Sequence, residues 1–210
     1  MGQNMPSRSN AHHQRVADTA SRLILASGSP RRAELLREYG YEFEVIPPPA
    51  DEPSPPAGGT DPVEWAVKVS LLKAESVAAV VKEGWILSGD TIAAIGERIF
   101  GKAAGRAEAE AILRSLAGTT HRVITGVALL DAGKGRRLTG HDITLVTMRP
   151  LSDVEVGEYL DTGAWRGKAG AYGIQDRGDA FVERIDGSFT NVVGLPMELI
   201  RRMLEEWTRS

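Results

Sequence analysis

Segments of strand character alternate with segments of helical periodicity along most of the chain, and this alternation restricts the fold more than any other feature. Apolar or alternating stretches predict strands at 22–26, 41–46, 85–88, 92–95, 98–100, 120–130, 137–148 and 180–185. Helical spacing and helix-start residues predict helices at 29–39, 63–81, 106–116, 152–160 and 196–207. Because helices follow some strands and tight turns follow others, we expect both parallel and antiparallel pairing. The pattern predicts an α/β or α+β fold with a mixed central sheet and flanking helices.

The composition is typical of a globular protein with one large domain or two small lobes. The chain has 210 residues, of which 42% are hydrophobic and 25% are charged. It contains no cysteine, which excludes disulfides, thiolate catalysis and zinc–cysteine sites. The net charge of −3 argues against nucleic acid as the main partner. No apolar run approaches the roughly 20 residues of a membrane-spanning helix.

The first 21 residues differ in character from the rest of the chain. They are polar, include His12 and His13, and lack the apolar core of a secretory signal. We expect a disordered tail at 1–21, followed by one folded domain at 22–210.

The first strand is followed at once by an unusual helix start, LASGSPRRAELL at 25–36. Ser29 fits the N-cap and Pro30 the first helical position. Arg31 and Arg32 then fall in the first turn, where the helix dipole disfavours each cation by roughly 0.3–1 kcal/mol. A bound phosphate would remove this conflict, because backbone N–H groups and guanidiniums both bind anions. The alternative is that both arginines are solvated or pair with glutamates of the same helix.

Carboxylates and a further cation accompany this turn. Asp90 follows the predicted strand 85–88, at the carboxyl end where α/β proteins place ligands, although it could also cap a turn. Asp51 and Glu52 lie within the proline-rich loop 47–61, and with Asp90 they could bind a divalent metal. Lys102 follows a glycine at a strand end and is either a ligand-binding group or a solvated lysine.

The glycine-rich segment 163–178 carries Lys168 and Gln175. A glutamine amide both donates and accepts, which suits recognition of the edge of a base. Cations for phosphates, carboxylates for Mg²⁺ and an amide for a base together indicate a nucleotide site. The sequence lacks the P-loop, Rossmann, HExxH and GxSxG motifs, and His121 and His141 lie in β segments as structural residues.

Five separated blocks of the sequence resemble, in order, the Maf family of house-cleaning nucleoside triphosphate pyrophosphatases. They are LILASGSPRRAELL at 23–36, DE at 51–52, LSGDTIAAIGERIFGK at 87–102, AGTTHRVITGVAL at 117–129 and KAGAYGIQDRGDAFVERIDGSFTNVVGLP at 168–196. The resemblance implies an α/β fold of two lobes around a deep cleft, akin to the inosine triphosphatase-like enzymes. It also implies hydrolysis of a nucleoside triphosphate to the monophosphate and pyrophosphate with Mg²⁺ or Mn²⁺.

The resemblance assigns roles to individual residues. Asp90 is the implied proton acceptor, and Glu52 with Asp90 would hold the metal. Substrate choice falls to Arg31, Thr91 and Gln175. The implied phosphate-binding residues are Ser27, Arg31, Arg32, Lys73 and Lys102.

The AGAYGIQ block resembles the subgroup that acts on dTTP and UTP. The subgroup that acts on 7-methyl-GTP commonly has Glu in place of Gln175, and it remains an alternative substrate class. A second alternative is a nucleotide- or DNA-binding regulator without catalysis, because members of the family have been linked to septum formation. Ala103 stands where the family commonly has proline, and the loss of that proline would loosen Lys102 without removing it. We expect a cytoplasmic homodimer with a nucleoside triphosphate as its substrate.

Overall fold

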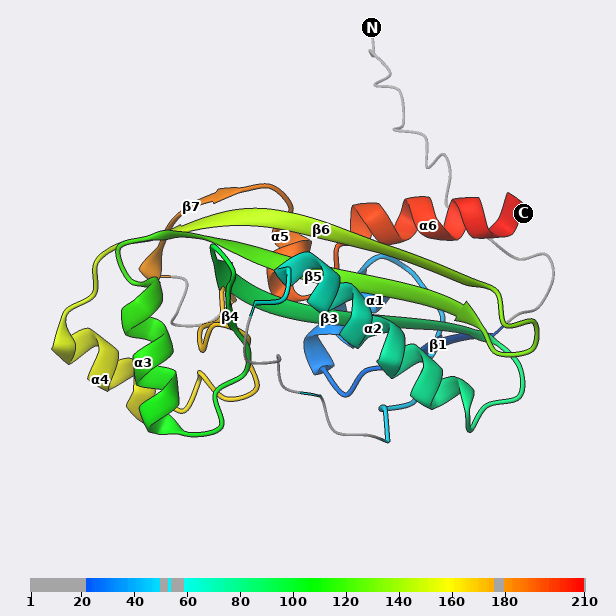
Figure 1. Cartoon of the computed structure of the whole chain (residues 1–210), viewed down its shortest axis with the longest axis horizontal. Coiled ribbons are helices and arrows are strands. Elements are labelled where there is room, and N and C mark those ends of the chain that lie inside the picture. Colours follow the sequence, from blue (N-terminus) through cyan, green and yellow to red (C-terminus); the bar gives the residue numbers. More distant parts are fainter. Residues whose placement is uncertain (1–21, 50–52, 54–58, 176–179, 210) are drawn as a thin grey trace, which may run out of the picture.

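A single mixed sheet of seven strands forms the centre of the computed structural model (Figure 1). The structure describes residues 22–49, 53, 59–175 and 180–209, so the predicted tail at 1–21 lies outside the described residues. The order β2-β1-β3-β5-β6-β7 runs across the sheet, with β4 beside β3. Strand β1 is parallel to β2 and β3, and the other pairs are antiparallel, which confirms the mixed sheet. The strands are β1 Leu23–Leu25, β2 Glu44–Val45, β3 Trp85–Ile95, β4 Arg98–Phe100, β5 Thr120–Asp131, β6 Arg137–Met148 and β7 Val182–Asp186.

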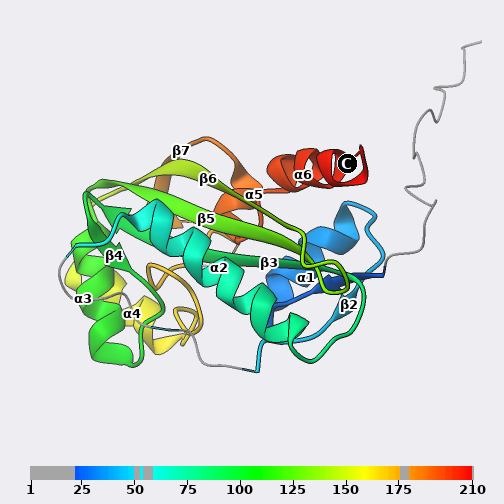
Figure 2. The same cartoon turned by 45° about the vertical axis from the view of Figure 1, so that its right-hand side comes forward.

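Helices cover both faces of the sheet. The helices are α1 Pro30–Glu38, α2 Pro62–Ala78, α3 Arg106–Leu116, α4 Asp153–Asp161, α5 Phe189–Val193 and α6 Met197–Arg209. Ile24 and Ile86 face α2, whereas the neighbouring Leu25 and Leu87 face α1 and α6. Figure 2 shows α2 and α6 on opposite sides of the sheet, and α3 beside α4 at one end. Every described helix is too short or too polar to cross a membrane.

Strand β3 corrects one prediction. We expected a strand at 85–88 that ended before Asp90, but β3 continues without interruption from Trp85 to Ile95. Strand β5 explains the difference, because it pairs with β3 residue by residue from Trp85 to Ala94. Asp90 therefore lies in the middle of a strand, opposite Gly126 of β5.

Gly126 lets α2 approach the sheet at this position. A Cβ on this residue would lie 2.3 Å from the backbone of Ala66 in α2, a distance that no side chain could occupy. The close approach brings Lys73 of α2 within reach of Asp90.

The other edge of β3 is covered in two separate pieces. Strand β1 pairs with residues 85–87, and β4 pairs with residues 93–95. Among the described residues, no strand pairs with 88–92 on this edge. The middle of β3 therefore faces an opening in the sheet, and the candidate site lies there.

Other predicted elements agree closely or differ at their ends. Helix α3 has the predicted bounds, and Ser152 caps α4 in a capping box with Glu155. Strand β2 has two residues rather than the six predicted at 41–46. Helix α5 was not expected from the sequence. Its Asn191 side chain donates to the Val123 carbonyl of β5, so long-range hydrogen bonds hold this short helix in place.

Candidate functional site

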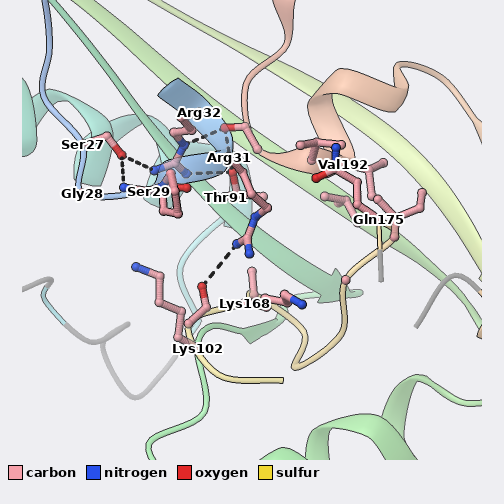
Figure 3. Close-up of a pocket in the computed structure, with 18 of the residues that line it drawn as sticks. Ser27, Gly28, Ser29, Arg31, Arg32, Thr91, Lys102, Lys168, Gln175 and Val192 are labelled. Carbon is pink, nitrogen blue, oxygen red and sulfur yellow. Dashed lines mark hydrogen bonds between the residues drawn. The ribbon is translucent and has the colours of Figure 1, made fainter. Parts of the chain in front are cut away.

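A pocket of about 520 Å³ brings together most of the sequence-predicted site residues that the structure describes, but Asp90 is not among its lining residues. Residues from 27–32, 166–175 and 192–194 line it, together with Lys73, Thr91 and Lys102. Figure 3 shows Ser27–Ser29 at one end, Gln175 and Val192 at the other, and Lys102 and Lys168 on one side between them. The pocket thus has one end built by a turn and a helix start, and another built by a loop and helix α5.

The turn before α1 forms as the sequence predicts. Ser29 stands at the N-cap of α1 with an extended backbone, and Pro30 follows at the first helical position. The Ser29 side chain does not accept the expected capping hydrogen bond from a backbone amide, and the Ser29 amide donates to Ser27 Oγ at 3.2 Å. Ser27 thereby closes the turn and faces the pocket.

The two arginines of this turn have different environments. Arg32 is buried, and all three of its guanidinium nitrogens donate to protein oxygens. Its Nε donates to the Gly194 carbonyl at 2.7 Å, Nη1 to Ser27 Oγ at 3.2 Å and Nη2 to Thr91 Oγ1 at 3.0 Å. Arg31 is half-buried, and its Nη2 reaches the Gly167 carbonyl at 3.4 Å. Arg32 is therefore built into the wall, whereas Arg31 projects into the pocket (Figure 3).

Asp90 and Lys73 form a buried ion pair. Lys73 Nζ lies 2.6 Å from Asp90 Oδ1, and both side chains are less than one-tenth exposed. Breaking such a pair is costly, because it leaves an uncompensated charge in the interior. Lys73 also lines the pocket, so it lies between the carboxylate and the space that a ligand would fill.

Thr91 faces the opposite side of the sheet from Asp90, as strand alternation requires. Its hydroxyl accepts from Arg32 and lies 2.9 Å from Thr125 Oγ1 of β5. Thr125 in turn donates to the Asn191 carbonyl at 3.2 Å. Thr91 is thus linked to the segment that carries Val192 and Gly194.

Among the described residues that line the pocket, six are cationic and none is acidic. They are Arg31, Arg32, Lys73, Lys102, Arg166 and Lys168. Lys168 is buried and Lys102 is exposed. The backbone of Lys102 pairs with that of Ala169 in an isolated β-bridge, which links the two segments that carry these lysines. This concentration of positive charge suits a polyphosphate, although the chain as a whole is negative.

Arg166 and Val192 are pocket residues that the sequence did not single out. The Arg166 guanidinium lies over the Trp165 ring, 5.0 Å from its centroid. Val192 comes from α5 and lies beside Gln175 at one end of the pocket (Figure 3). Val192 lies in the sequence block 168–196 that resembles the Maf family. Gly194 of the same block has a φ of 129°, which favours glycine.

The predicted metal ligands are only partly described. Asp51 and Glu52 lie outside the described residues. Within the residues that the structure describes, no group of three or more His, Cys, Asp or Glu side chains converges. His121 is buried against Tyr172, and His141 is exposed on β6, so neither belongs to a described ligand cluster.

The chain is similar to known proteins over most of its length. The Maf-like protein family model matches residues 22–207. A dTTP/UTP pyrophosphatase from Carboxydothermus hydrogenoformans is 42% identical over 89% of this chain and 98% of its own length. One from Geobacter metallireducens is 44% identical over 84% of this chain and 91% of its own length. One from Deinococcus radiodurans is 42% identical over 90% of this chain and 94% of its own length.

One solved structure also shows a partial likeness. It is a HAM1 protein from Coxiella burnetii, 19% identical, which covers 61% of this chain and 73% of its own with a TM-score of 0.43. That likeness is too weak to carry an argument, whereas the family model covers nearly all of the described residues. The chain belongs to the Maf family.

Proposed function

We propose that this protein hydrolyses dTTP and UTP to the nucleoside monophosphate and pyrophosphate. The observation that carries the proposal is the pocket itself, which gathers six cations at a site with no described acidic lining residue. Such a lining suits the triphosphate of a nucleotide. We infer thymine or uracil as the base because the three relatives compared above are dTTP/UTP pyrophosphatases.

Gln175 is the proposed reader of the base. Its amide can accept from N3–H and donate to O4 of uracil or thymine at the same time. The side chain is exposed at the end of the pocket opposite Ser27 (Figure 3), with Val192 beside it. Thr91 contributes to substrate choice indirectly, because its hydroxyl contacts Arg32 rather than pointing freely at a ligand.

Arg31, Lys102, Arg166 and Lys168 would neutralise the phosphates, together with the helix start of α1. Arg32 and Ser27 would hold the turn that presents this helix start. Positioning and charge neutralisation account for most of the catalysis of phosphoryl chemistry. These residues therefore perform the binding part of the reaction.

Asp90 is the proposed proton acceptor for the attacking water. Lys73 holds one carboxylate oxygen at 2.6 Å and so fixes the orientation of the other. The carboxylate oxygens of Asp90 and Glu52 suit a hard divalent cation, which commonly binds one or two carboxylates plus substrate phosphates. When bound, Mg²⁺ or Mn²⁺ would neutralise phosphate charge.

A nucleotide panel tests the proposal. The whole chain is incubated with dTTP, UTP, CTP, ATP, GTP and 7-methyl-GTP, with Mg²⁺, with Mn²⁺ and with chelator, and released pyrophosphate is measured. We expect dTTP and UTP to be the best substrates and chelator to abolish turnover. A preference for 7-methyl-GTP would move the chain to the other substrate class. Binding without turnover would support a regulator instead.

We also propose, from the family resemblance, that the protein acts as a cytoplasmic homodimer. Light scattering of the purified chain tests the assembly, and we expect the mass of two chains. A mass of 22.6 kDa would show a monomer.

A further inference from the structure

Tyr172 joins the pocket to the core beneath it. Its ring lines the pocket, yet the residue is only 5% exposed. Its hydroxyl lies 2.8 Å from Nε2 of His121, which projects from β5. The two rings meet edge to face, with centroids 5.6 Å apart. The contact connects the loop that carries Gln175 to the central sheet.

The loop needs such a connection because its backbone is strained just before Tyr172. Gly170 and Ala171 adopt successive left-handed conformations, with φ of 69° and 57°. A residue with a Cβ avoids this region, and it stays there only where the surroundings fix it. Ala171 is completely buried.

Backbone contacts fix the first half of the turn. The Gly170 amide donates to the Gly101 carbonyl at 3.1 Å, next to the bridge between Lys102 and Ala169. A Cβ on Gly170 would lie about 3.2 Å from Ala93 and Leu116, so the turn packs tightly on the core. The second half, 173–175, follows Tyr172 directly.

The side chain of His121 makes one hydrogen bond among the described residues, the one to Tyr172. The residue is 1% exposed, and burial lowers the pKa of its imidazole to about 4. Its Nδ1 has no hydrogen-bond partner among the described residues. A buried polar atom without a partner costs stability, so packing alone would favour an apolar side chain here. The hydrogen bond to Tyr172 is the feature that only a polar residue supplies.

We propose that His121 and Tyr172 are positioning residues for base recognition, and that their hydrogen bond holds 173–175 so that the Gln175 amide faces the base. The inference rests on the proposed function, because it assigns base reading to Gln175. Neither residue reacts with the substrate. They act by fixing the loop, and their loss should affect nucleotide selection more than turnover.

Matched variants test this inference. Tyr172→Phe removes only the hydroxyl, and His121→Leu removes the partner. His121→Gln is the conservative variant, since its amide can reach the position of Nε2. Tyr159→Phe is the control, because Tyr159 is buried in the same core cluster, stacks edge to face on Phe181 and does not line the pocket.

Steady-state kinetics with UTP and GTP, together with melting temperatures, provide the readout. For Tyr172→Phe and His121→Leu we expect KM for UTP to rise about three- to tenfold, the effect of one lost buried hydrogen bond. We expect kcat to stay within about twofold, the preference for UTP over GTP to fall, and His121→Gln to restore much of the loss. The double variant should be no worse than the worse single variant.

Two results would overturn the inference. One is a common loss of kcat on both nucleotides that follows the loss of melting temperature, which indicates a structural role only. The other is an equal effect of Tyr159→Phe. If the wild-type chain hydrolyses no nucleotide, the proposed function fails. Hydrogen exchange of the 173–175 amides then still tests whether His121 and Tyr172 hold this loop in position. Faster exchange in Tyr172→Phe than in Tyr159→Phe supports it, and equal exchange refutes it.

Discussion

The two walls of the pocket are built in different ways. The turn wall, Ser27–Arg32, is a strand end and a helix start whose outline is visible in the local sequence. The loop wall, Arg166–Gln175, has no helix or strand of its own and is held by contacts to 101–102 and His121. The turn wall thus rests on regular structure, whereas the loop wall rests on tertiary contacts. We therefore expect changes in the turn wall to affect all nucleotides alike, and changes at the Gln175 end of the loop wall to affect them unequally.

Asp90→Asn should have the largest effect, because Asp90 is the proposed proton acceptor and belongs to neither wall. Loss of a general base typically lowers turnover about 10²- to 10⁴-fold, and we expect one common factor for every nucleotide. The measurement is kcat and KM with pyrophosphate detection. Asp131→Asn is the control, because Asp131 caps a distant turn through the amides of Gly133 and Lys134. A loss that depends on the base would place Asp90 in selection rather than in catalysis.

Gln175→Glu tests the loop wall directly. The substitution removes a donor and adds a charge, which leaves O4 of thymine or uracil unpaired. An unpaired buried polar group costs about 1–3 kcal/mol, so the preference for UTP over GTP should fall roughly ten- to a hundredfold. Values of kcat/KM on dTTP, UTP, GTP and 7-methyl-GTP give the answer. A uniform drop on all four nucleotides would show that Gln175 does not read the base.

The loop wall should also respond to pH through His121. Burial lowers the pKa of His121 to about 4 in the folded protein, from 6.5 in the unfolded chain. Between these values the unfolded chain binds more protons, so the free energy of unfolding falls as the pH falls below 6.5. We expect a loss of about 2 kcal/mol between pH 7 and pH 5 from this residue.

Denaturant unfolding at the two pH values measures this loss. His121→Gln should remove it, whereas the exposed His141→Gln should not. An unchanged pH dependence in His121→Gln would mean that the imidazole is not the group that titrates.

Substitutions of Arg31 and Arg32 allow two residues of the turn wall to be compared. Arg32→Lys keeps the charge but loses the fork that reaches Gly194, Ser27 and Thr91 together. We expect kcat/KM to fall about tenfold on every nucleotide and stability to fall by about 1 kcal/mol. Arg31→Lys should change kcat/KM less than about threefold, since its one described contact is long. Kinetics and urea unfolding of both variants check the order, and the reverse order would mean that the Arg31 guanidinium is the main phosphate ligand.

The smallest effect should come from the tail. We propose that residues 1–21 lie outside the folded domain and belong to neither wall, because they are polar and precede β1. Deletion of 1–21 should leave the melting temperature and kcat/KM nearly unchanged. A clear loss of either would show that the tail packs on the domain.

Local signals predicted much of the fold and part of the site. The helix at Arg106–Leu116 and the antiparallel pair around 131–135 follow from helix periodicity and a glycine-rich turn, both of which are local. The turn at Ser27–Pro30 is local as well. These features depend on residues that are close in the sequence, so the sequence alone indicates them.

Features set by distant pairing were not predicted. Gly89 and Asp90 suggest the end of a strand, but β5 pairs across them and β3 continues. Helix α5 is held by Asn191 through β5 and β6, and Arg32 reaches Gly194 at a separation of 162 residues. No local pattern contains these contacts, because their partners are far apart in the sequence.

Phosphorus NMR of the first products shows which phosphorus of the nucleotide the enzyme attacks. UTP is mixed with the whole chain and Mg²⁺, and the spectrum is followed from the earliest turnover. We expect UMP and pyrophosphate as the first products, with dTTP behaving in the same way. UDP and orthophosphate as the first products would contradict this expectation, because the site would then cleave the terminal phosphate rather than release pyrophosphate.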